Sequence, residues 1–278
     1  MISHSEDTFN GADGISLYYQ FWRPEQAPRG ILVIVHGLCG HSGLFPNLVE
    51  PLTNHNFAVY TFDLRGHGHS PGQRGHIMSW REYRQDLGAF LQLISTREPG
   101  IPVFLFGDSL GAAIVLDYIL QEHEGLRGAA IDGAPIQPTG SSSPGKIFLA
   151  RLLSPIAPAT PIPFGLDINA LSRDPAFVQG FSSDPLVHDS VSVRWGTEVL
   201  KTIEYFRAHA SQINLPMLIL HGEADHINSA EGARWLYEQI TYPDKELHIY
   251  PGVYHLTHND YGHEQVAADL EAWMARHL

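Results

Sequence analysis

The chain has 278 residues, of which 44% are hydrophobic and 17% carry a formal charge. A chain of this length buries most of its unfolded surface, so the composition excludes intrinsic disorder and predicts a sizeable core without disulfide or metal staples. Thirty acidic residues against 17 basic ones give a net charge of -13. This acidity argues against nucleic acid as a partner, because phosphate binding needs a basic surface.

Features that would indicate another compartment are missing from the sequence. The single cysteine, Cys39, excludes an intramolecular disulfide. Residues 1–7 have neither the basic region nor the apolar stretch of a signal peptide. Apolar runs such as Ile31–Val35 are far shorter than the roughly 20 residues that cross a bilayer. We therefore expect a soluble, cytoplasmic protein.

Short apolar segments recur along the chain and predict strands. An alternating segment at 15–22 is expected as an outer strand, and mostly apolar segments are expected as buried strands at 31–35, 57–62, 103–106, 128–132, 217–220 and 247–250. Continuous apolar strands are typical of parallel sheets that are buried on both faces.

Helices are expected between these strands, because apolar residues recur there at three-to-four spacing. The expected helices cover residues 42–54, 79–96, 109–123, 229–240 and 263–277. Ser79 and Glu82 resemble a capping box at the start of the second of these helices. The alternation predicts an α/β fold, with a mostly parallel central sheet flanked by helices on both faces.

One long segment, residues 135–214, interrupts the alternation. It contains no clear buried strand, and seven of the 19 prolines lie between residues 135 and 163. From Ser172 onward its pattern becomes helical and amphipathic. We therefore divide the chain into a core of residues 1–134 and 215–278 and an inserted helical segment of residues 135–214.

The strongest chemical signal is the segment Gly107-Asp108-Ser109-Leu110-Gly111. An apolar strand ends just before it and a helix is expected just after it, which is the context of a nucleophile on a sharp strand-to-helix turn. Glycines on both sides of the serine allow the tight backbone that such a turn requires. The pattern predicts Ser109 as a catalytic nucleophile.

A nucleophilic serine needs a base, and the base needs a carboxylate that orients it. Asp225 and His255 each stand five residues after an expected strand, at the carboxyl edge where sites of open α/β sheets gather. We expect Asp225 as the acid and His255 as the base. Glu223 is a weaker alternative for the acid, and His258 is the nearest alternative for the base.

Two backbone N–H groups are expected to bind the oxyanion of the tetrahedral intermediate. His36-Gly37 follows the strand at 31–35, and the next residue, Leu38, is expected to provide one N–H. Leu110, directly after the nucleophile, is expected to provide the other from the positive end of its helix. This prediction rests on position, because any residue carries a backbone N–H.

Several further motifs resemble the monoacylglycerol lipase and lysophospholipase branch of the α/β-hydrolases, which is often grouped with serine aminopeptidase-like hydrolases. These motifs are His36-Gly37-x-x-Gly40-His41-Ser42-Gly43, Asp63-Leu-Arg-Gly-His-Gly-His-Ser70, Gly107-Asp-Ser-Leu-Gly111, Ser183-Asp-Pro-Leu186, Gly222-Glu-Ala-Asp225 and Tyr254-His255. The resemblance runs from about Ile15 to the C-terminus and implies the α/β-hydrolase fold and the triad above. The chain departs from the branch at Asp108, where His is frequent, at Leu110, where Met is frequent, and at Gly40, where an acidic residue is common.

Three alternative interpretations are weaker. Residues 107–110 also spell the motif of the GDSL hydrolases, with Asp260 and His263 as acid and base, but that family carries its nucleophile close to the N-terminus. His67 and His69 are too few for a zinc site, and the resemblance makes their segment a structural loop. Nothing near Cys39 would activate a thiolate. No metal and no organic cofactor is expected.

In the α/β-hydrolase architecture the insertion is expected to form a cap over the active site. Its six basic and six acidic residues cancel, and its first part is rich in apolar side chains. We expect Phe148, Leu152, Ile156 and Phe164 to bind the acyl chain of a substrate, and the cap to touch membranes or micelles transiently. The alternative is that these side chains pack the cap onto the core.

Together these observations predict a serine hydrolase that cleaves carboxylic esters of lipids through an acyl-enzyme, with a monoacylglycerol or a lysophospholipid as the substrate. A general carboxylesterase or an amide-cleaving peptidase on the same triad is the alternative enzyme. A ligand-binding receptor of the same fold with slow turnover is the alternative from another class. The oligomeric state is left open by the sequence.

Overall fold

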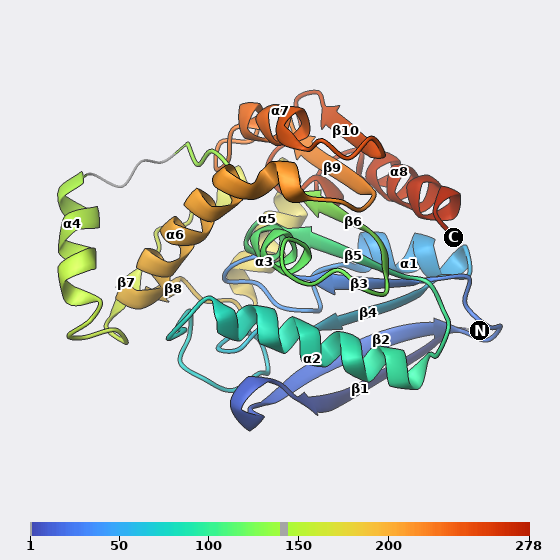
Figure 1. Cartoon of the computed structure of the whole chain (residues 1–278), viewed down its shortest axis with the longest axis horizontal. Coiled ribbons are helices and arrows are strands. Elements are labelled where there is room, and N and C mark those ends of the chain that lie inside the picture. The colour runs from blue at the N-terminus through green and yellow to red at the C-terminus, as the bar shows by residue number, and fades with distance from the viewer. Residues whose placement is uncertain (1, 140–143) are drawn as a thin grey trace.

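In the computed structural model, which describes residues 2–139 and 144–278, eight strands form one central sheet (Figure 1). The strands are β1 (Ile2–Asn10), β2 (Ser16–Pro24), β3 (Ile31–Val35), β4 (Ala58–Phe62), β5 (Val103–Asp108), β6 (Leu126–Asp132), β9 (Met217–Gly222) and β10 (Lys245–Tyr250). Their order is β1-β2-β4-β3-β5-β6-β9-β10. The two contacts of β2 are antiparallel and all others are parallel, so the expected mostly parallel sheet is confirmed.

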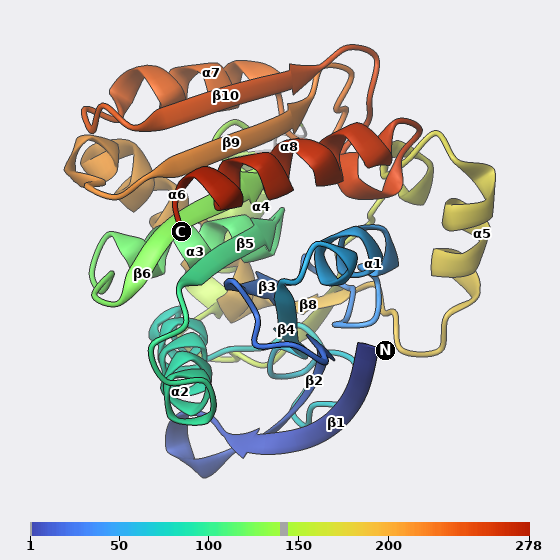
Figure 2. The same cartoon turned by 90° about the vertical axis from the view of Figure 1, so that its right-hand side faces the viewer.

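Helices cover both faces of this sheet (Figure 2). They are α1 (Pro46–Asn54), α2 (Arg81–Arg97), α3 (Leu110–Ile119), α7 (Ala230–Gln239) and α8 (His263–Arg276). Side chains alternate along β3, so that Leu32 and Ile34 pack toward α1 and α8, while Ile31, Val33 and Val35 pack toward α2 and α3. The continuous apolar sequence of this strand therefore reflects burial on both faces.

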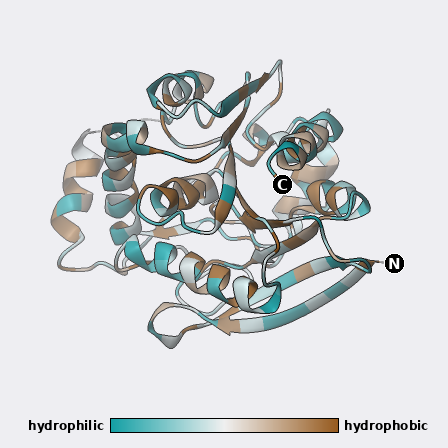
Figure 3. Ribbon diagram, turned by 45° about the vertical axis from the view of Figure 1, so that its right-hand side comes forward, coloured by the Kyte–Doolittle hydropathy of each residue, from teal (hydrophilic) through white to brown (hydrophobic). Residues whose placement is uncertain are grey.

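The sequence pattern does not predict β1. Phe9 is the only buried side chain of its nine residues, and the strand is largely hydrophilic (Figure 3). β1 is nonetheless paired with β2 along its whole length, because backbone hydrogen bonds at a sheet edge do not require apolar side chains. Two helix ends differ from expectation by four residues, since α1 begins at Pro46 rather than at residue 42 and α3 ends at Ile119 rather than at residue 123, and the other ends agree within two residues.

The insertion lies between β6 and β9 in chain order. Its described elements are α4 (Pro144–Leu153), β7 (Pro161–Pro163), α5 (Pro175–Ser183), β8 (Ser190–Ser192) and α6 (Val193–His209). β7 and β8 pair as a small antiparallel sheet. α6 packs on α3 of the core, and α4 packs on α6 at the outer side of the molecule (Figure 1).

Four short 3-10 helices complete the described structure: η1 (Ala12–Gly14), η2 (Ile168–Ala170), η3 (Ala210–Gln212) and η4 (Thr257–Asn259). Among the helices of residues 2–139 and 144–278, none is both long and apolar enough to cross a bilayer. The parallel strands β3, β5, β6, β9 and β10 end at one edge of the sheet, and the loops that follow them carry the residues expected to perform the chemistry.

Candidate active site

Ser109 lies on a strained turn between β5 and α3. Its φ of 50° and ψ of -112° place a non-glycine residue in the left-handed half of backbone space. The Ser109 N–H donates to the Asp132 carbonyl on the neighbouring strand at 2.9 Å. A Cβ at Gly107 would overlap the backbone of Gly111, and a Cβ at Gly111 would overlap the carbonyl of Val35. Glycine at both positions therefore allows strand, turn and helix to approach this closely.

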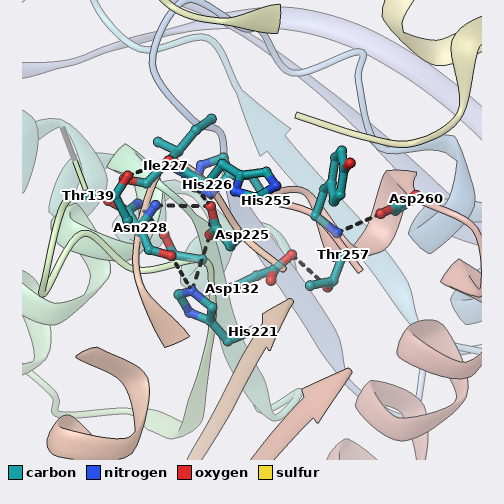
Figure 4. A network of polar contacts seen from close by, with 12 residues as sticks. Asp132, Thr139, His221, Asp225, His226, Ile227, Asn228, His255, Thr257 and Asp260 are labelled. Carbon is teal, nitrogen blue, oxygen red and sulfur yellow. Dashed lines mark hydrogen bonds and ion pairs between the residues drawn. The ribbon is translucent and has the colours of Figure 1, made fainter. Parts of the chain in front are cut away.

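Asp225 and His255, which follow β9 and β10, are hydrogen bonded to each other (Figure 4). His255 Nδ1 and Asp225 Oδ2 are 2.7 Å apart. The second carboxylate oxygen of Asp225 accepts the N–H groups of Ile227 at 2.7 Å and Asn228 at 3.0 Å. Because Asp225 is an acceptor, the Nδ1 of a neutral His255 carries the proton and Nε2 is left with its lone pair.

The pKa of Asp225 is held far below its ordinary value. Burial alone would raise this pKa, but hydrogen bonds from His221 and His255 stabilise the carboxylate and outweigh burial. Asp225 is therefore ionised at neutral pH and stabilises a positive charge on His255.

His221 is a contact of Asp225 that the sequence analysis missed. Its Nε2 lies 3.2 Å from Asp225 Oδ2 and 2.9 Å from the Asn228 carbonyl. Burial lowers the pKa of His221, but the Asp225 carboxylate outweighs burial and the net pKa is raised. The only sequence signal was its place at the end of an expected strand, four residues before Asp225.

The alternative acid, Glu223, and the alternative base, His258, do not join this pair. His258 Nδ1 is 2.9 Å from Asp132 Oδ2, and the Thr257 hydroxyl donates to the same oxygen at 2.9 Å. The His258 ring is stacked on Phe45. Glu223 is exposed. The structure therefore pairs the expected acid with the expected base and gives His258 a different carboxylate.

The turn after β3 lies against Ser109, because a Cβ at Gly37 would be 3.4 Å from Ser109 Cβ. His36 Nε2 accepts the Leu64 N–H at 3.0 Å, so its Nδ1 carries the proton and donates to the Gly37 carbonyl at 2.7 Å. The Gly40 N–H also donates to that carbonyl at 3.3 Å. The Gly37 carbonyl and the Leu38 N–H belong to the same peptide group, and in a planar trans peptide they point in opposite directions. The hydrogen bonds that hold the Gly37 carbonyl therefore also fix the direction of the Leu38 N–H, which points away from His36.

The four apolar residues expected to bind an acyl chain lie in the insertion and are exposed. Phe148, Leu152, Ile156 and Phe164 expose 64%, 52%, 81% and 41% of their surface. Phe164 contacts the ring of Trp195 on α6. The other three lie on or just after α4, which packs on α6 of the insertion, and their binding of an acyl chain stays a prediction.

The residues of the weaker alternatives are engaged in other contacts. Asp260 accepts the Tyr254 N–H at 2.7 Å and pairs with Arg173, and His263 is the first residue of α8. Burial raises the pKa of the Cys39 thiol to about 12, so this thiol is not a nucleophile at neutral pH. Within the described part of the chain, no three His, Cys, Asp or Glu side chains are grouped so that they could hold a metal ion.

Comparison with known proteins gives one consistent picture. The sequence profile of the family described as serine aminopeptidase, S33 (Hydrolase_4) matches residues 26–262. A monoacylglycerol lipase of Mycolicibacterium smegmatis is 28% identical over 277 residues, which cover 99% of both chains. The crystal structure of a monoacylglycerol lipase of Paleococcus ferrophilus is 33% identical, with a TM-score of 0.86, over 94% of this chain and 99% of that one.

A soluble variant of the monoglyceride lipase of Saccharomyces cerevisiae, solved with a substrate analog, is 26% identical with a TM-score of 0.87, over 98% of this chain and 94% of that one. These comparisons confirm the α/β-hydrolase fold, the expected branch and the class of carboxylic ester hydrolases. The chain belongs to the serine aminopeptidase S33 family of α/β-hydrolases.

Proposed function

We propose that this protein is a monoacylglycerol lipase that works through a Ser109–His255–Asp225 triad. The observation that carries the proposal is the 2.7 Å hydrogen bond between His255 Nδ1 and a buried, ionised Asp225, at the sheet edge where Ser109 stands on its strained turn. The choice of a lipid ester is supported by relatives named monoacylglycerol lipase that align with nearly the whole chain.

In this mechanism the Ser109 hydroxyl attacks the ester carbonyl while His255 Nε2 takes its proton. Asp225 keeps His255 in the tautomer with a proton on Nδ1 and stabilises the imidazolium that forms. The N–H groups of Leu38 and Leu110 bind the oxyanion, and each such donor contributes roughly 100- to 1000-fold in turnover. His255 then protonates the departing glycerol oxygen and activates the water that hydrolyses the acyl-enzyme.

The insertion, residues 135–214, would act as a cap in this reaction. The apolar side chains of Phe148, Leu149, Leu152 and Ile156, on and just after α4, are exposed. This helix lies at the outer side of the molecule and has hydrophobic stretches along it (Figure 3). Such a surface suits contact with a micelle or membrane from which a monoacylglycerol is taken. The cytoplasmic location expected from the sequence stays a prediction, to be tested by cell fractionation.

A substrate panel with purified protein tests the proposal. It contains mono-, di- and triacylglycerols, lysophosphatidylcholine, p-nitrophenyl esters of graded chain length and aminoacyl amides. We expect steady multiple turnover with the highest kcat/KM on monoacylglycerols, and its loss in Ser109→Ala but not in Ser95→Ala, which changes an exposed serine on α2. Preference for lysophosphatidylcholine or amides would contradict the substrate, a single turnover would indicate a receptor, and activity of Ser109→Ala would contradict the mechanism.

A further inference from the structure

One segment of the insertion, residues 184–192, contacts the turn that follows β3. His41 Nε2 and Asp184 Oδ2 are 3.0 Å apart, and their side chains are only 10% and 24% exposed. His41 Nδ1 accepts the Gly43 N–H at 3.1 Å, so Nε2 carries the proton and donates to Asp184. A single imidazole therefore links the backbone of the turn to the insertion.

The Asp184 carboxylate is fixed on its own side as well. Its other oxygen accepts the Leu186 N–H at 2.8 Å. Burial raises the pKa of Asp184, but the Leu186 N–H and His41 outweigh burial and the net pKa is lowered. The carboxylate is thus ionised at neutral pH and strengthens the hydrogen bond from His41.

His188 makes the second connection. Its backbone N–H donates to the Cys39 carbonyl at 3.3 Å. Its ring lies 4.7 Å from that of His67, and His67 lies 5.3 Å from His36, centroid to centroid. These three imidazoles form a column from the insertion to His36, whose Nδ1 holds the Gly37 carbonyl.

The same segment is attached to the loop after β4. The Ser192 N–H donates to the Gly75 carbonyl at 2.9 Å, and the Ser192 hydroxyl lies 2.8 Å from His76 Nδ1. A side chain at Gly75 would collide with the backbone of Ser190. Residues 184–192 are therefore held at several points and can act as a fixed support for the turn.

The turn itself needs such a support. Cys39 has a φ of 67°, a left-handed conformation that costs a non-glycine residue about 1 kcal/mol or more. Rotation of the Gly37–Leu38 peptide would direct a carbonyl instead of an N–H toward the oxyanion and would abolish its stabilisation. The contacts of the insertion with Cys39 and His41 act on the second half of the turn and oppose this rotation.

We propose that Asp184 and His188 are positioning residues, through which the insertion fixes the turn that presents the Leu38 N–H to the oxyanion. In this view the insertion has a part in the chemical step besides any part in binding the acyl chain. The inference rests on the proposed function for its oxyanion donor, and it gives a role to the Ser183-Asp-Pro-Leu186 motif.

The test separates kcat from KM on p-nitrophenyl acetate, whose acyl group is too short to need an acyl-chain site. We expect Asp184→Ala to lower kcat about tenfold or more with KM nearly unchanged, since part of one oxyanion donor is lost. Asp184→Asn, which keeps an acceptor for His41, should recover much of the loss. Reaction of Ser109 with a fluorophosphonate, whose adduct places a phosphoryl oxygen in the oxyanion hole, should slow in parallel.

Asp167→Ala is the matched control, because the Asp167 carboxylate accepts the Asn169 N–H at 3.1 Å within the insertion and lies outside residues 184–192. Its kcat on the acetate ester should stay at the parent value. A double variant, His41→Ala with Asp184→Ala, should lose less than the product of the two single losses, because both single variants remove the same His41–Asp184 hydrogen bond.

An unchanged kcat on the acetate ester in Asp184→Ala, with a raised KM for long-chain esters, would overturn the inference and leave Asp184 a cap residue. A loss of kcat in the double variant that equals the product of the two single losses would also overturn the inference. Circular dichroism and melting temperature identify a variant that fails to fold. If Asp184→Ala does not fold, the kcat of Asp184→Asn on the acetate ester is used to test the inference. Because the acetate assay needs no lipid, failure of the monoacylglycerol proposal is seen separately in the substrate panel.

Discussion

Asp108, directly before Ser109, is a buried carboxylic acid beside the reacting atoms. It is 4% exposed, and its Oδ1 has no hydrogen-bond partner among the residues that the structure describes. Burial raises its pKa to about 6, with Asp132 raising it further and His258, His255 and the Gly37 N–H opposing the rise. The charge of this group changes within the range of pH in which the enzyme would work.

Asp108→Asn is predicted to stabilise the protein most at alkaline pH. The pKa of Asp108 is about 6 in the folded protein and about 3.9 when unfolded, so its ionised form opposes folding above pH 6 and this penalty fades as the pH falls toward 4. The gain of the variant in free energy of unfolding should shrink by roughly 1 to 1.5 kcal/mol between pH 8 and pH 5. Urea unfolding at both pH values measures it.

Asp269→Asn provides a control of opposite sign. Burial raises the pKa of Asp269, but hydrogen bonds from His248, Gln265 and Tyr250 outweigh burial and lower it. This variant should lose stability at pH 8 and lose less at low pH. A gain of Asp108→Asn that is the same at pH 8 and pH 5 would show that Asp108 is not the group that titrates.

At the scale of elements, the exposed apolar side chains of α4 are available to bind lipid rather than being used to pack the insertion. Four apolar side chains of α4 are exposed, namely Phe148, Leu149, Leu152 and Leu153. In contrast, α6 buries Trp195 and Phe206. Each large apolar side chain that moves from water into lipid contributes about 1.5 to 3 kcal/mol. Two of them therefore suffice for a measurable affinity for a lipid surface.

Replacing Phe148 and Leu152 together by Asp is predicted to reduce binding to phosphatidylcholine vesicles at least tenfold. The kcat/KM on long-chain monoacylglycerol should fall with it, while activity on p-nitrophenyl acetate stays unchanged. Ile2→Asp, which changes a side chain 43% exposed on β1, is the control. Vesicle co-sedimentation measures the binding, and equal sedimentation of all three proteins would exclude α4 as the lipid contact.

Elements that form because they bury apolar side chains could be predicted from the sequence. Elements that are held by backbone pairing alone could not. The parallel strands of the core give mostly apolar runs, and these runs locate Asp225 and His255 a few residues after strand ends. The expectation of burial is wrong for β10, whose residues are only partly buried because it lies at the edge of the sheet. The sequence pattern does not predict β1, because this strand is held by backbone pairing with β2. The contacts of His221, Asp132 and Asp108 could not be predicted either, because they arise only where the ends of several strands come together in the fold.

At the scale of the whole molecule, the net charge of -13 lies outside the insertion, because the six basic and six acidic residues between 135 and 214 cancel. The 17 histidines could offset this charge in mild acid, but several of them are buried as neutral side chains. Burial lowers the pKa of His36 to about 3 and lowers that of His67 well below its ordinary value. These buried histidines link the stability of the whole fold to pH.

The protein is predicted to lose stability below about pH 6.5, the pKa of an unfolded histidine. His36 and His67 bind protons only after unfolding in this range, so the free energy of unfolding falls with pH, and each contributes up to about 1.4 kcal/mol per pH unit. Asp108 opposes this below pH 6, because its folded form binds a proton that the unfolded chain does not. His67→Gln removes one of these histidine contributions, so its loss of stability between pH 7 and pH 5.5 should be smaller than that of the parent by about 1 kcal/mol. Urea unfolding at the two pH values measures this difference, with His55→Gln as the control because the His55 side chain is 58% exposed. Parallel pH dependence of all three proteins would contradict the link, since the proton taken up on unfolding would then not belong to the histidine column.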